Sequence, residues 1–67
     1  MKTSFIPSYY ASNAERLARF AALNVDHLRE IIAECEAKGL EYMVMMHRAN
    51  LKKWEAVLSD PAAYVEA

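Results

Sequence analysis

The stretch Ala37-Lys38-Gly39-Leu40-Glu41 contains the only glycine of this 67-residue sequence. Long runs with the hydrophobic spacing of a helix lie on either side of it, and that spacing changes phase at Gly39. Glycine readily adopts the left-handed conformation that ends a helix, and Leu40 is then placed to fold back on Cys35. We therefore predict a turn at residues 39–40 between two antiparallel helices. One long helix through Gly39 is the alternative, since glycine inside a helix costs only about 1 kcal/mol, but the change of phase argues against it.

The first predicted helix covers residues 13–38, with Ser12 as its cap. Ser12 and Glu15 have the spacing of a capping box, in which each side chain bonds the other residue's backbone amide. From residue 14 onward, apolar side chains recur at alternating steps of four and three, which is typical of a helix packed against another helix. This stripe consists of Ala14, Ala18, Ala21, Val25, Leu28, Ile32 and Cys35.

The second predicted helix covers residues 41–58 and carries a matching stripe. Its members are Leu40, Val44, His47, Leu51, Trp54 and Leu58. Folding the chain about Gly39 places Trp54 opposite Val25 and the small Ala21, a large-against-small match that fills space well. The fold class that follows is all-α, an antiparallel two-helix hairpin in a single domain of residues 1–67.

The two ends of the chain are expected to complete this domain. Residues 1–11 have aromatic side chains around Pro7, which disfavours a helix before it, and we predict an irregular arm whose aromatics dock on the hairpin. The arm can pack on its own subunit or across a dimer. Asp60 followed by Pro61 is a good helix start, so residues 60–67 are expected to form a short C-terminal helical turn.

Both helices are apolar beyond the stripe that a hairpin buries. Fully burying such a side chain is worth about 1.5–3 kcal/mol, and surplus apolar surface on a small protein usually marks an association surface. We therefore predict that two hairpins dimerise into a four-helix bundle. The predicted dimer interface consists of Leu17, Phe20, Ile31, Met43, Met46 and Val57.

No arrangement of residues in the sequence indicates catalysis or metal binding, so we expect a protein that is not an enzyme and has no cofactor or metal. Cys35 and His47 lie about one turn apart across the hairpin, but a catalytic pair also needs an orienting group and a pocket. His27 precedes Glu30 in the reverse of the order used by bundle di-iron sites, and no second such pair exists. The lone cysteine and the lack of a run of roughly 18 apolar residues indicate a soluble cytoplasmic protein.

The charges support two hypotheses about what the protein binds. Glu30, Glu34, Glu36 and Glu41 are expected near the turn, where they would suit a basic protein surface. Tyr42 and Met45 lie nearly opposite the stripe. The predicted partner-binding residues are Tyr42, Met45, Glu30, Glu34 and Glu41.

The alternative is a small helical dimer that binds nucleic acid. Its contacts would be the basic residues expected at the open end of the hairpin, Arg16, Arg19, Arg48, Lys52 and Lys53. The net charge of -1 and the pI near 6.1 are low for this function, and no recognition helix is evident. A structural subunit of a larger assembly is a third possibility that the sequence does not separate from a protein-binding module.

A short chain capped at Ser12, turning at Gly39 and carrying a Met-Val-Met-Met helix resembles the small helical inhibitors encoded by bacteriophages. Over residues 13–58 it is similar in outline to quorum-sensing anti-activators, which bind a LuxR-type regulator. The resemblance implies a non-enzymatic inhibitor that captures a host protein, such as a bacterial transcription regulator, and keeps it from DNA. It rests on size and architecture, and it carries over no functional residues.

Overall fold

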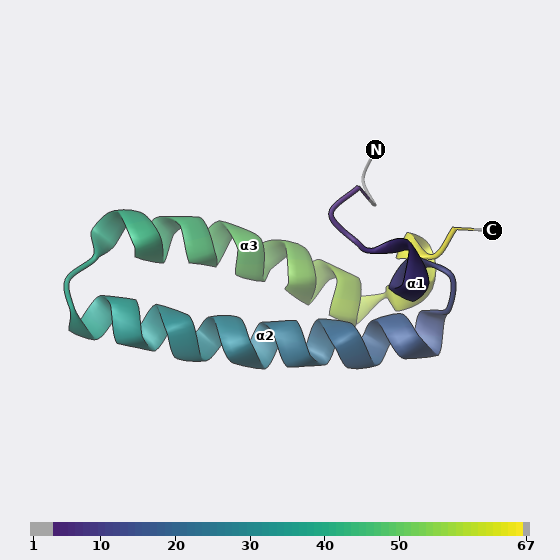
Figure 1. Ribbon diagram of the computed structural model, residues 1–67, viewed down its shortest axis with the longest axis horizontal. Helices are drawn as coiled ribbons and strands as arrows, with labels where there is room; N and C mark the ends of the chain where they lie inside the picture. Colours follow the sequence, from purple (N-terminus) through teal and green to yellow (C-terminus); the bar gives the residue numbers. More distant parts are fainter. Residues whose placement is uncertain (1–3, 67) are drawn as a thin grey trace.

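The computed structural model describes residues 4–66 as a helical hairpin with short helices at its open end (Figure 1). In chain order the elements are α1 (Ser8–Ala11), α2 (Ala14–Ala37), α3 (Glu41–Ser59) and the 3₁₀ helix η1 (Pro61–Tyr64). The helices α2 and α3 lie antiparallel and side by side, and the molecule measures 42 × 21 × 18 Å. The predicted all-α hairpin is confirmed, with the turn at the predicted place.

The turn between α2 and α3 is a complete Schellman motif. Gly39 has a φ of +70°, and it alone has a positive φ among residues 4–66. The Gly39 amide donates to the Glu36 carbonyl at 3.1 Å, and the Leu40 amide donates to the Cys35 carbonyl at 3.0 Å. These two bonds satisfy carbonyl groups that the end of α2 would otherwise leave without partners. Glycine is needed here because a side chain is disfavoured at this φ.

The cap of α2 is Asn13, so the prediction of Ser12 was wrong by one residue. The Asn13 side-chain oxygen accepts from the Arg16 amide at 2.9 Å, while its backbone is extended. The Ser12 hydroxyl instead donates to the Tyr9 carbonyl, also at 2.9 Å. The Ser12 side chain does not cap α2 because it bonds to the helical segment that precedes it. Asn13 is at least as good a cap as serine.

The core runs along the facing sides of α2 and α3. On α2 the predicted stripe is buried at Ala21, Val25, Leu28, Ile32 and Cys35, and Leu17 is fully buried in place of the half-buried Ala14. The central stripe positions of α3, residues 44, 47 and 51, are half-buried, and Trp54 is buried. No buried side-chain nitrogen or oxygen among residues 4–66 lacks a hydrogen-bond partner.

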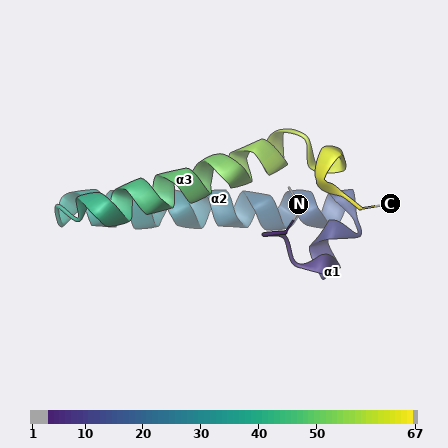
Figure 2. The same ribbon diagram turned by 90° about the horizontal axis from the view of Figure 1, so that it is seen from above.

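The stripe of α3 shifts near its C-terminus, where Val57 is fully buried and the predicted Leu58 is 38% exposed. Figure 2 shows the reason: toward the open end α3 swings to one side of α2, and α1 lies on the other side. A helix of 3.6 residues per turn also drifts from a strict seven-residue repeat. Val57 therefore joins the same buried cluster as Ile6 and Ala11 of the N-terminal segment.

The N-terminal arm (residues 4–12 of the described chain) packs its aromatic rings on the hairpin. The Tyr10 ring stacks on Phe20 with centroids 3.8 Å apart, and the Phe5 ring meets Trp54 edge-to-face at 5.3 Å. Phe20 and Trp54 are themselves edge-to-face at 5.3 Å, so the rings form one continuous ladder. Each such pair is worth roughly 0.5–1.5 kcal/mol beyond its buried area.

The arm is more regular than predicted, and it closes the open end together with the C-terminal segment. The Pro7 carbonyl accepts from the Tyr10 and Ala11 amides, which forms the single turn of α1. The Glu66 amide donates to the Ala11 carbonyl at 2.9 Å, so the C-terminal end of the described chain is bonded to the last residue of α1. The predicted C-terminal turn is present as η1, with Pro61 in its first turn.

Candidate protein-interaction surface

Exposed apolar side chains are concentrated at the start of α3. Among residues 4–66, eight large apolar side chains are exposed, and five of them lie within residues 40–46. They are Leu40, Tyr42, Met43, Met45 and Met46. This segment follows the turn directly, where only α2 packs against α3 and the arm does not reach.

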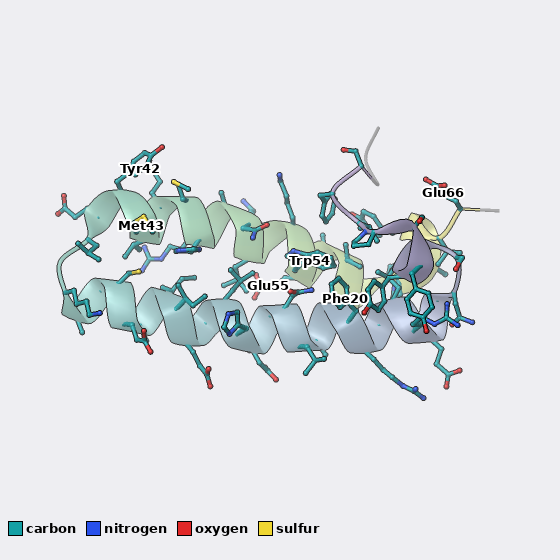
Figure 3. All side chains as sticks on the ribbon, in the orientation of Figure 1. Phe20, Tyr42, Met43, Trp54, Glu55 and Glu66 are labelled. Atoms are coloured by element: carbon teal, nitrogen blue, oxygen red, sulfur yellow. The ribbon has the colours of Figure 1, made fainter. Side chains whose placement is uncertain are left out.

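These side chains divide between two faces of α3. Tyr42 and Met45 are 66% and 60% exposed, and helical spacing directs both away from α2. Figure 3 shows the Tyr42 side chain pointing away from α2. Met43 and Met46 are less exposed, at 39% and 45%, and lie along one edge of the hairpin. The predicted separation of a Tyr42–Met45 patch from a Met43–Met46 patch is therefore present in the fold.

The edge with Met43 and Met46 also carries the half-buried Ile31 of α2, and we call it the apolar side. Of the predicted dimer residues, these three are the ones accessible to a second chain. Leu17 and Val57 are fully buried within one chain, and Phe20 packs between Tyr10 and Trp54. The sequence did not separate these groups, because the arm covers only the half of this side nearest the open end.

The opposite side of the hairpin is polar and carries two ion pairs between the helices. Arg29 of α2 donates to Glu55 of α3 at 3.1 Å, and Arg48 of α3 pairs with Glu36 of α2. The partners on each helix are seven residues apart, so both pairs lie on the same side. Each is exposed and therefore worth less than about 1 kcal/mol.

The predicted acidic cluster is not a single surface. Spacing along α2 places Glu30 and Glu34 on the face turned away from α3, and both are exposed. Glu36 is on the polar side with Arg48, and Glu41 lies in the first turn of α3. Of the acidic residues predicted to bind a partner, only Glu41 lies near Met45. The prediction of one cluster rested on the distance of these glutamates from the turn along the chain. It did not take into account the direction in which each side chain points around its helix.

A shallow hollow of about 490 Å³ lies at the turn, where Glu41 and Met45 meet. Its lining residues are Glu36, Gly39, Leu40, Glu41, Val44, Met45 and Arg48. Three apolar side chains and the Glu36–Arg48 pair thus face one open depression. The hollow makes the exposed start of α3 concave and is too open to enclose a small molecule.

The predicted basic end is largely occupied by contacts within the chain. The Arg16 guanidinium lies 4.1 Å from the Tyr9 ring centre and donates to the Tyr9 carbonyl. Arg19 pairs with Glu15 at 3.3 Å. Arg48 is not at this end, because it pairs with Glu36 near the turn. Within residues 4–66, Lys52 and Lys53 are therefore the predicted nucleic-acid contacts with no ion pair.

A second hollow, of about 470 Å³, lies beside these lysines. Its lining residues are Ser4, Phe5, Ala49, Lys52, Lys53, Ala56 and Tyr64. The Lys53 ammonium lies 5.6 Å from the centre of the Phe5 ring, which places it at the rim. Ala49 and Ala56 were not among the surface residues predicted from the sequence. The signal that could have identified them is their spacing of seven residues, which places both on the exposed face of α3.

The remaining candidates for chemistry are spread along the hairpin. Cys35 is buried with a free thiol, and His47 is half-buried in the α3 stripe. Within residues 4–66, no group of three or more metal-ligating side chains converges, and no helix is long and apolar enough to cross a membrane. Comparison with protein-family models, curated protein sequences and solved structures returns no match.

Proposed function

We propose that this protein is a non-enzymatic binding module that captures and regulates another protein. The observation that carries the proposal is the group of exposed apolar side chains at residues 40–46. These side chains are 39–66% exposed, so a partner that covered them would recover part of the about 1.5–3 kcal/mol that full burial of each is worth. Methionine suits this role because its flexible, polarisable side chain adapts to the shape of a partner.

Two different faces support two different contacts. The apolar side, with Ile31, Met43 and Met46, is the proposed homodimer interface. The outward-facing Tyr42 and Met45 are the proposed contacts for the captured protein. Their greater exposure supports this assignment, because a dimer formed through the apolar side would leave them accessible.

The resemblance to phage-encoded anti-activators suggests the class of target, a bacterial transcription regulator. Binding of this kind needs no catalytic group, which fits a 67-residue chain with shallow surface hollows. The inhibitor would act by occupying a surface that the regulator needs, so its effect would follow binding stoichiometry.

The test is a pull-down of the tagged full chain from a lysate of its native host, with and without nuclease. We expect a stoichiometric protein that survives nuclease treatment and is lost with the Tyr42→Ala/Met45→Ala variant. Leu23→Ala is the matched control, since Leu23 is 69% exposed but lies on α2. Recovery of nucleic acid, with loss of bound protein after nuclease, would contradict the proposal and make Lys52 and Lys53 the site.

A further inference from the structure

The outer face of α3 carries a second repeat of seven residues, separate from the buried stripe. Tyr42, Met45, Ala49, Lys52 and Ala56 follow one another at steps of three, four, three and four. All five are exposed, and the repeat falls on the face turned away from α2. Alternating steps of three and four are the spacing with which one helix packs along another. Since the buried stripe already serves α2, this repeat is left exposed in residues 4–66, with Phe5 and Tyr64 at the edge of its C-terminal half.

The side chains of the repeat have the sizes that a docked helix needs. Tyr42 and Met45 are large and sit near the turn, whereas Ala49 and Ala56 are small and line the second hollow. Small residues allow a second helix to approach closely, and the large pair offers anchors. From residue 42 to residue 56 an α-helix rises about 21 Å, enough for four turns of a partner.

The charged residues on the outer face of α3 determine which kind of helix can bind there. Lys52 occupies a position within the repeat, and Lys53 lies directly beside it at the rim of the same hollow. The nearby charged residues of α3 are engaged on the polar side, Arg48 with Glu36 and Glu55 with Arg29. The outer face between residues 42 and 56 therefore presents two lysines and no carboxylate, although the whole chain has a net charge of -1. A charged residue at a packing position specifies its partner, because an unmatched charge there is costly.

We propose that the outer face of α3 is a docking site for an acidic amphipathic helix of the captured protein. The partner helix has apolar residues facing Tyr42 and Met45 and a carboxylate facing Lys52. This assignment rests on the proposed function and adds the chemistry of the partner. It also reverses the expectation from the sequence, in which glutamates near the turn were to meet a basic surface.

The experiment uses two labelled synthetic helices of three seven-residue repeats. Both have leucine at the packing positions; one carries glutamate opposite and beside Lys52, and the other carries lysine there. Fluorescence anisotropy with the full chain should show at least tenfold tighter binding of the glutamate helix. Lys52→Glu/Lys53→Glu should reverse the preference, and Arg19→Glu, a charge change on α2, should leave it intact. Each substituted residue is exposed, and circular dichroism checks that each variant folds.

A second variant separates packing from simple attraction of charge. Lys52→Met should reduce the preference for glutamate over lysine while strengthening binding of a helix with leucine opposite residue 52. Equal binding of the two probes, no binding of either, or an unchanged preference in Lys52→Met would each overturn the assignment.

Two further measurements identify other occupants of this face. Loss of a dimer mass in the Tyr42→Glu/Met45→Glu variant would assign the face to a second copy. Displacement of the glutamate helix by a single-stranded oligonucleotide, unaffected by Tyr42→Ala, would assign it to nucleic acid. Either result contradicts the docking site. If the pull-down retains a protein while the glutamate helix fails to bind, this inference alone falls; if only nucleic acid is retained, the proposed function falls.

Discussion

Gly39 holds the turn through its backbone conformation alone. Its φ is +70°, and a methyl group added there would meet no atom within 4 Å. Gly39→Ala should therefore lower the free energy of unfolding by about 1 kcal/mol, entirely through the strained φ. Urea denaturation followed by circular dichroism measures this, and Gly39→Asn should cost less because asparagine tolerates this region. An alanine variant of equal or greater stability would instead favour a helix continuing through residue 39.

Asn13 and Ser12 offer a second test at a single residue. Asn13→Ala removes the acceptor of the Arg16 amide and should cost about 1 kcal/mol of stability. Ser12→Ala loses only an exposed hydrogen bond to the Tyr9 carbonyl, and its cost should be smaller. Equilibrium unfolding of the two variants side by side decides the cap; a larger loss at Ser12 would restore the sequence-based assignment.

At the level of the elements, the pairing of α2 with α3 depends on the buried stripe. Leu28 is 6% exposed, and Leu23, five residues earlier on the same helix, is 69% exposed. Leu28→Asp buries a charge without a partner and should abolish the cooperative thermal transition. Leu23→Asp places the same charge in water and should retain a native-like melt. A cooperative melt for the Leu28 variant would contradict the packing of the hairpin.

The long helices could be predicted from the sequence because their signals are local. The period of the apolar residues and the position of Gly39 are enough for the hairpin, and α2 and α3 begin and end within a few residues of the predicted bounds. The burial of Val57 within its own chain could not be predicted, since it depends on where α1 lies beside α2. Arg48 and Glu36 are twelve residues apart in the chain, and whether they form an ion pair depends on the register of the two helices.

For the whole molecule, the arm limits how two chains can associate. It covers the apolar side near the open end, so the surface available to a second copy is the half around Ile31, Met43 and Met46. Sequence reasoning placed Phe20 in this interface because its helical spacing is right. Only the folded arm, through the stacked Tyr10 ring, shows that Phe20 is already in contact.

The proposed dimer gives a prediction at this scale. Met43→Glu/Met46→Glu should convert a species of twice 7.6 kDa into one of 7.6 kDa, measured by light scattering after size-exclusion chromatography. The charges would be buried without partners in the dimer but remain in water in the monomer. Tyr42→Glu/Met45→Glu on the outer face is the control and should keep the dimer mass. A monomeric parent protein, or an unchanged mass in the first variant, would move or remove the interface.

The hydrogen bond between the Glu66 amide and the Ala11 carbonyl joins the two terminal segments of the described chain, which has a mechanical consequence. Figure 1 shows α1 and the C-terminal segment beside the open end of the hairpin, far from the turn. A pulling force applied through them would act across the helix pair and not along it. Once this bond and the ring contacts of the arm with Trp54 and Phe20 separate, α3 would peel from α2 one turn at a time toward Gly39. Thermal unfolding must disrupt the entire core at once, whereas a pulling force breaks the contacts of only one helical turn at each step. The molecule should therefore unfold at low force.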